Sequence, residues 1–123
     1  MGNYEFDLDL PEGEFAEELV KSILCEKGRS TIEVKRDFYV SDSGNVAIEY
    51  RARGNKSGIA VTKAEWWAFV LDGDKYNHEI IIFIKTERLR EIARAFYQKG
   101  SHTKGGDDLS SEMVLIPVLE LLK

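Results

Sequence analysis

Two acidic side chains, Asp37 and Glu49, are the residues of this chain that are best placed to do chemistry. Asp37 ends one predicted strand and Glu49 lies inside the next, twelve positions later, with the turn-like segment 41–45 between them. On neighbouring strands their carboxylates would meet at one point in space. Two carboxylates that meet bind a cation, share a proton or repel each other. The pair therefore predicts either a metal site or two surface acids on a hairpin.

A metal held by this pair would suit phosphodiester chemistry. Mg²⁺ takes a few carboxylate oxygens and keeps waters and phosphate oxygens in its other positions. It can activate a water, orient the phosphate and neutralise charge on the leaving oxygen. The backbone carbonyl of Tyr50 is a further candidate ligand. Arg51 is expected on the same face as Glu49, because side chains alternate along a strand; in the alternative interpretation Arg51 is only a cross-strand partner.

Basic residues follow this pair closely along the chain. Arg51, Arg53, Lys56 and Lys63 fall within thirteen residues, and they predict either a rim that receives phosphates or a solvated charged loop. Ser57, which stands between Gly54 and Gly58, resembles a phosphate-contacting residue. The net charge of −5 argues against a nucleic-acid coat protein, which binds through excess positive charge. It does not exclude an enzyme whose metal-binding acids add negative charge.

Hydrophobic periodicity predicts the elements that position these residues. Apolar residues four apart predict a helix over 14–27, with Glu17 at the edge of its apolar arc and Glu14 and Glu18 further into its polar face. Alternating patterns predict strands over 30–39 and 45–53, joined as a hairpin. Further along we expect strands over 65–71, 79–86 and 113–116, a helix over 87–99 capped by Thr86, a flexible polar loop over 100–111, and a last helical turn opened by Pro117. This order predicts a small α/β domain with helices packed on a mixed sheet.

Bulk properties limit the classes of protein. A chain of 123 residues with 43% hydrophobic content predicts a single domain over 1–123, with 1–13 as a tail or edge strand. No apolar run approaches the roughly 20 residues that cross a bilayer, and the N-terminus lacks the pattern of a signal peptide. The single Cys25 excludes an internal disulfide and fits a reducing, cytoplasmic setting.

Four segments resemble the PD-(D/E)XK nuclease superfamily, above all its small phage-type and Holliday-junction-resolvase-like members. They are EVKRD (33–37), GNVAIEY (44–50), KSGI (56–59) and TKAEWW (62–67), and the resemblance spans roughly residues 14–119. It implies a restriction-endonuclease-like fold, with a central mixed sheet of about four or five strands flanked by helices. It also implies dependence on Mg²⁺ or Mn²⁺, a DNA substrate, a bacterial or phage-infected host cell, and a homodimer that cuts both strands.

The resemblance also implies roles for individual residues. The helix carboxylate would be Glu17, with Glu14 and Glu18 as alternatives, and the strand acids would be Asp37 and Glu49. Arg51 stands where the superfamily has Lys. Because Arg is always charged, it cannot act as a general base, although it can still hold a phosphate.

Lys35 or Lys63 would then supply the missing ammonium. We therefore expect a metal-dependent DNA endonuclease. The alternatives are a catalytically silent nucleic-acid-binding module of the same fold and an acidic interaction or inhibitor protein that mimics DNA.

Overall fold

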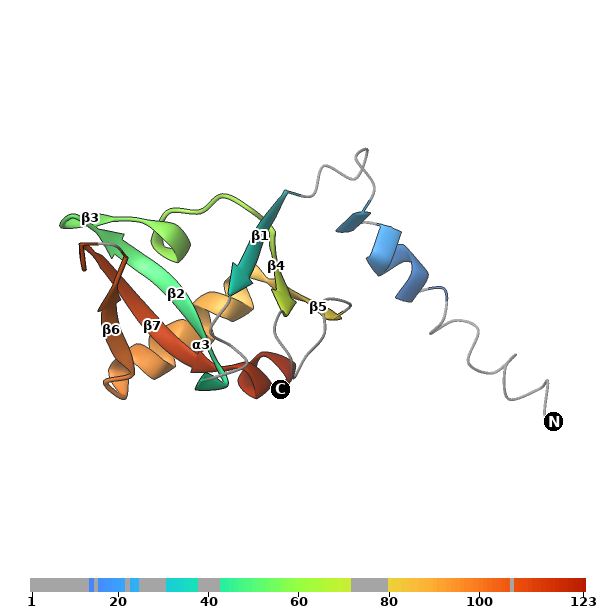
Figure 1. The fold of residues 1–123 in the computed structure, drawn as a ribbon. Coiled ribbons are helices and arrows are strands. Elements are labelled where there is room, and N and C mark those ends of the chain that lie inside the picture. The colour runs from blue at the N-terminus through green and yellow to red at the C-terminus, as the bar shows by residue number, and fades with distance from the viewer. Residues whose placement is uncertain are drawn as a thin grey trace. The chain divides into compact units, whose positions relative to one another are not determined.

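The computed structural model describes residues 14, 16–21, 23–24, 31–37, 43–71, 80–106 and 108–123. The chain divides into two compact units, Met1–Thr31 and Ile32–Lys123. In the first unit, residues 16–21 are helical as predicted, and the exposed Glu17 lies among them (Figure 1). The predicted tail or edge strand over 1–13 and the residue Cys25 lie outside the described residues.

Within its described residues, the second unit folds into two sheets and the helix α3 (Thr86–Gln98), which Figure 1 shows beside β2 and β7. One sheet has the order β1-β4-β5, in which β1 runs parallel to β4 and β4 antiparallel to β5. The other is antiparallel with the order β3-β2-β7-β6. The strands are β1 (Ile32–Asp37), β2 (Asn45–Ala52), β3 (Asn55–Lys56), β4 (Trp66–Leu71), β5 (Ile80–Lys85), β6 (His102–Gly105) and β7 (Ser111–Pro117); the helices are α3 (Thr86–Gln98) and the short 3₁₀ turns η2 (Gly58–Ala60) and η3 (Val118–Leu122). The unit is a small α/β domain, as the sequence predicts.

The predicted hairpin between the first two strands is wrong. Strand β1 pairs with β4, whereas β2 pairs with β3 and β7 in the other sheet. The physical reason lies in β2, whose fully buried Val46 and Ile48 stand opposite the buried Ile116 and Val114 of β7. Two apolar strands that share one face bury more surface together than β2 would bury beside the charged β1. The strands therefore form two sheets and not one central sheet.

The remaining elements follow the sequence pattern with two exceptions. The predicted polar loop over 100–111 contains β6, which adds an edge strand to β7. Thr86 does not cap α3, because Lys85 occupies the N-cap position. The hydroxyl of Thr86 is buried and donates a hydrogen bond of 2.6 Å to the carbonyl of Ala64. Thr86 therefore ties the start of α3 to the segment that leads into β4.

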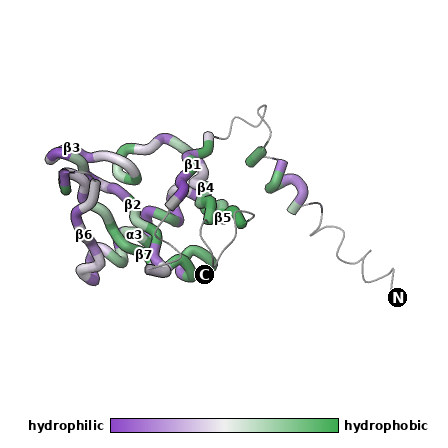
Figure 2. Tube along the Cα trace, in the orientation of Figure 1, coloured by the Kyte–Doolittle hydropathy of each residue, from purple (hydrophilic) through white to green (hydrophobic). Residues whose placement is uncertain are grey.

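Among the described residues, one apolar core joins both sheets to α3. Its largest fully buried side chains are Trp67, Phe69, Ile48, Leu89, Ile116 and Val46. Figure 2 shows hydrophobic residues gathered on β4 and β5 and hydrophilic ones along β3 and β6. On β5, however, Ile80, Ile81 and Phe83 are exposed among the described residues. The predicted homodimer would find apolar surface there, and it stays a prediction.

Gly58 marks the point where η2 crosses β2, and its substitution tests how tightly the two are packed. Its φ is +52°, and an added Cβ would lie against the backbone carbonyl of Glu49, closer than real Cβ contacts come. Gly54 has a φ of +79°, but a Cβ added to Gly54 would have no atom within 4 Å. We expect Gly54→Ala to cost about 1–2 kcal/mol from its left-handed backbone alone, and Gly58→Ala to cost more. Urea unfolding of both variants measures the difference, and equal losses would contradict this packing.

Candidate functional site

A hollow of about 400 Å³ lies between β2, η2 and α3 in the second unit. We call it the Arg–Tyr cleft. Its lining comprises Tyr50, Arg51, Ile59, Ala60, Arg90, Ala93, Arg94, Tyr97 and Val114. Among the described residues that line it, none is acidic. The buried Ile59, Ala93 and Val114 give the cleft an apolar floor below three guanidinium groups and two phenol rings.

A β-bulge in β2 brings two neighbouring residues to this cleft. The register between β2 and β7 shifts between Glu49, which stands opposite Met113, and Arg51, which stands opposite Glu112. The extra residue is Tyr50. A bulge places two residues of one strand against one of its partner and re-aims a side chain. Consecutive residues Tyr50 and Arg51 therefore both line the cleft, where strict alternation would send them to opposite faces.

The bulge also overturns the expected relation between Glu49 and Arg51. Residues that stand opposite each other on paired strands share a face. Arg51 shares a face with Glu112, and Glu49 shares one with Met113, the residue next to Glu112 in β7. Neighbours in a strand point to opposite faces. The prediction that Glu49 and Arg51 share a face is therefore wrong, because the bulge adds one residue between them.

Two arginines of α3 line the cleft in different ways. Arg90 is half-buried and donates to the carbonyl oxygens of Ile59, at 3.0 Å, and Thr62, at 2.8 Å. These bonds fix its guanidinium and hold η2 against α3. Arg94, one turn further, is exposed and has no hydrogen bond or ion pair with any residue that the structure describes. Arg90 therefore has a structural task, and Arg94 presents its charge to solvent and cleft.

Glu112 lies at the edge of the cleft and contacts both residues of the bulge. Its Oε2 is 4.0 Å from Nε of Arg51, and both side chains are partly exposed, so this ion pair contributes little stability. Partial burial raises the pKa of Tyr50; the charge of Glu112, the neighbouring Tyr97 and a hydrogen bond to Glu112 raise it further, while Arg51 opposes the shift. Tyr50 is thus an uncharged phenol that donates to Glu112 at neutral pH.

The aromatic rings continue from the cleft onto β6. The Tyr97 ring centroid lies 5.4 Å from that of Tyr50, in an edge-to-face arrangement, and 4.9 Å from that of His102, in a stacked one. None of Arg90, Arg94 and Tyr97 is among the site residues that the sequence predicts. Their spacing of four and then three residues was the available signal, because it places all three on one stripe of a helix.

The predicted acidic site is only partly described. Asp37 ends β1 opposite Leu71, and its side chain lies outside the described residues. Glu49 is half-buried on β2, and Glu17 belongs to the first unit. The carbonyl of Tyr50, a predicted metal ligand, accepts a hydrogen bond of 3.0 Å from the backbone N–H of Ser57. Across the described part of the chain, no three Asp, Glu, His or Cys residues are grouped in a way that could hold a metal ion.

The other predicted residues that the structure describes are not among the lining of the cleft. Arg53 in the β2–β3 turn and Lys56 in β3 are exposed, and the buried hydroxyl of Ser57 has no hydrogen-bond partner among the described residues. Lys63 lines a separate cavity of about 320 Å³ beside the start of α3. Lys35 lies 5.4 Å from the centre of the Trp67 ring and 3.9 Å from the carboxylate of Glu33. Of the predicted cationic residues, Arg51 is the one that lines the cleft.

Comparisons of the chain with protein-family models, curated proteins and solved structures found no match. The resemblance to PD-(D/E)XK nucleases therefore stays a prediction, and the residues themselves carry the functional argument. In the described part of the chain, no helix is long and apolar enough to cross a membrane.

The two arginines of α3 should differ in what their removal costs. Arg90→Ala removes two hydrogen bonds from a charged donor to backbone carbonyls, and we expect it to lower the free energy of unfolding by about 2 kcal/mol. Arg94→Ala is the matched control on the same helix, and its effect should stay within about 0.5 kcal/mol. Denaturant unfolding of both variants measures this. A similar loss of unfolding free energy in both variants would show that the Arg94 side chain makes stabilising contacts in solution.

Proposed function

We propose that the protein binds nucleic acid through the Arg–Tyr cleft. The observation that carries this proposal is the convergence of three arginines and two tyrosines on one cavity with an apolar floor. Guanidinium groups pair with phosphate oxygens in a bidentate geometry. Tyrosine rings provide faces on which bases stack, whatever the sequence. Both halves of a nucleotide thus find complementary groups in one place.

The distribution of charge supports the proposal. Residues 1–31 carry eight acidic and three basic side chains, whereas residues 32–123 carry fourteen of each. The whole net charge of −5 therefore belongs to the first unit, and the unit that contains the cleft is neutral. The chain's net charge is no argument against binding at the cleft. The same division confines the acidic excess that motivates the DNA-mimic alternative to the first unit.

A metal-dependent DNA endonuclease of restriction-endonuclease-like fold is our second proposal. Its support is that β2 carries Glu49 directly before the two bulge residues of the cleft. Asp37 and Glu49 would hold Mg²⁺ or Mn²⁺. Binding without cleavage is favoured over it for two reasons: Arg51 cannot act as a base, and the bulge places it on the face opposite Glu49.

Removal of cleft arginines should weaken binding and its salt dependence together. We expect Arg51→Ala and Arg94→Ala each to lower the affinity for a labelled oligonucleotide and to reduce the slope of log K against log salt by about 0.7–1, the share of one phosphate contact. Fluorescence anisotropy across a salt series, with chelator present throughout, measures both quantities.

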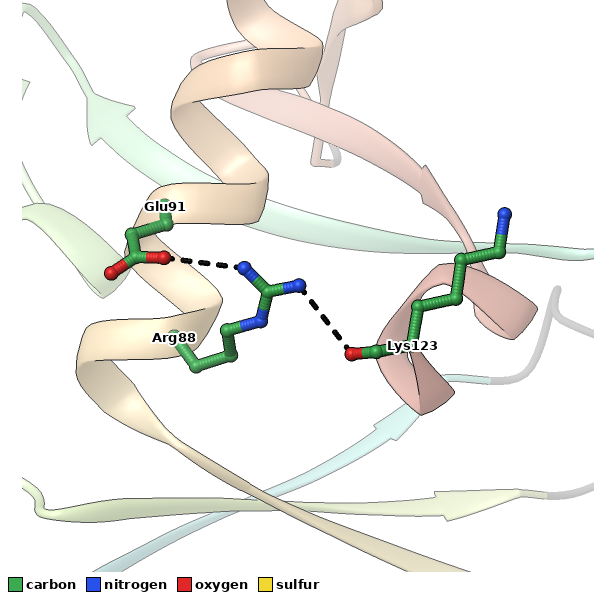
Figure 3. A network of polar contacts seen from close by, with 3 residues as sticks. All are labelled: Arg88, Glu91 and Lys123. Atoms are coloured by element: carbon green, nitrogen blue, oxygen red, sulfur yellow. Dashed lines mark hydrogen bonds and ion pairs between the residues drawn. The ribbon is translucent and has the colours of Figure 1, made fainter.

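Arg88→Ala is the matched control for this charge loss. Arg88 is exposed on the same helix but outside the cleft lining, and it contacts Glu91 at 3.2 Å and the carbonyl of Lys123 at 3.4 Å (Figure 3). Its removal should leave the salt slope unchanged. A loss of affinity as large as that of Arg94→Ala would show that nucleic acid binds elsewhere.

The nuclease proposal makes a separate prediction about the acidic pair. We expect supercoiled plasmid and branched DNA to be cut with Mg²⁺ or Mn²⁺ and not with chelator, and we expect Asp37→Ala and Glu49→Ala to abolish the cuts, because each removes a metal ligand. Circular dichroism shows whether the variants keep their fold. Cleavage that persists in both folded variants would disprove this site.

A further inference from the structure

We infer that the Arg–Tyr cleft receives an unpaired base, so that its ligand is single-stranded nucleic acid. This inference rests on the proposed function and adds the class of ligand. The alternative mode of binding uses phosphate contacts alone, and it would serve duplex and single strand alike. Three features of the cleft separate the two modes: a fixed aromatic ring, an apolar floor and unused hydrogen-bond donors.

The ring of Tyr97 is exposed yet held in place. Tyr97 is 46% exposed. The centroid of its ring lies 5.4 Å from that of Tyr50, which it meets edge-on, and 4.9 Å from that of His102, with which it stacks. Aromatic contacts of this kind stabilise ring orientation. A base that packs on the exposed part of this ring, away from His102, therefore meets a surface whose orientation is set before binding, which lowers the entropic cost of association.

The floor of the cleft suits an uncharged planar group better than a phosphate. Ile59, Ala93 and Val114 are buried, at 5%, 5% and 2% exposure, and they offer no hydrogen bond from a side chain. A phosphate placed against them would lose water on that side, and these three side chains offer it no hydrogen bond in return. A base loses little there, and the volume of about 400 Å³ falls in the range of small-molecule sites.

Arg90 supplies directional donors beside this floor. A guanidinium has five N–H donors, and Arg90 uses two of them on the carbonyls of Ile59 and Thr62. The others have no acceptor among the described residues. Carbonyl oxygens and ring nitrogens on the edge of an unpaired base are suitable acceptors, and in a duplex the pairing edge of each base is already occupied. Arg51 and Arg94, at the exposed rim, remain for the flanking phosphates.

The test compares three ligands of equal length on the full chain: a single strand, its duplex, and a single strand with abasic sites. At one salt concentration we expect the single strand to bind tighter than the other two. Tyr97→Leu should lower single-strand affinity about tenfold or more without changing the salt slope, because no phosphate contact is lost. Tyr97→Phe keeps the ring and should retain most of the affinity that Tyr97→Leu loses, and urea unfolding of both variants shows whether they are folded.

The outcomes separate this inference from the proposal beneath it. Equal affinity for all three ligands, with Tyr97→Leu unchanged, would overturn the inference and leave phosphate binding at the cleft in place. Affinity for none of them at low salt would overturn the proposed function itself. Weak abasic binding together with loss in Tyr97→Leu, but not in Tyr97→Phe, would support stacking of an unpaired base.

Discussion

The pairing of β2 with β7 is the interaction on which the second unit depends. Val46 and Ile48 bury their side chains completely where they meet the inner face of β7, and α3 closes over that face with the fully buried Leu89. The short turn η2 is anchored on the same strand, because the backbone N–H of Ser57 bonds to the carbonyl of Tyr50. The three elements that line the Arg–Tyr cleft, β2, η2 and α3, are thus all held by the paired strands β2 and β7. The bulge in β2 determines which of its side chains line the cleft.

The core and the cleft are formed by the same face of the β2–β7 pair. One face of the β2–β7 pair is apolar at Val46, Ile48, Val114 and Ile116, and becomes aromatic and cationic after the bulge. A guanidinium beside buried apolar groups is less screened than one in bulk water, so its attraction for an anion is stronger. Arg90 retains its position there because backbone carbonyls satisfy part of its hydrogen-bonding capacity. Arg90 therefore contributes both to the stability of the fold and to the proposed binding, whereas Arg94 contributes only to the binding.

The sequence predicts the elements of this unit well, and their partners poorly. Alternation located β1 and β2, short apolar runs located β4, β5 and β7, and helical periodicity located α3, because each of these patterns is local. Which strand covers that face depends on contacts between distant segments, so the pairing of β1 with β4 had no local signal. The bulge at Tyr50 could not be predicted either, because no Gly or Pro marks its position in the sequence. Strict alternation therefore predicted that Arg51 shares a face with Glu49. The stripe of Arg90, Arg94 and Tyr97 was visible in the spacing, but an exposed charged stripe on a helix is usually only a solvated surface.

The unequal charge of the two units determines which contacts can supply the free energy of nucleic-acid binding. At physiological ionic strength the Debye length is about 8 Å, so the cleft experiences its own arginines more than the chain's total charge. A unit with fourteen acidic and fourteen basic residues has no broad positive field, and counterion release can come only from a few phosphate contacts at the rim. The rest of the binding free energy must then come from contacts that desolvate the ligand, and the ring and floor of the cleft are the surfaces that provide them. Neutrality of the unit thus favours recognition of bases over attraction to the phosphate backbone alone.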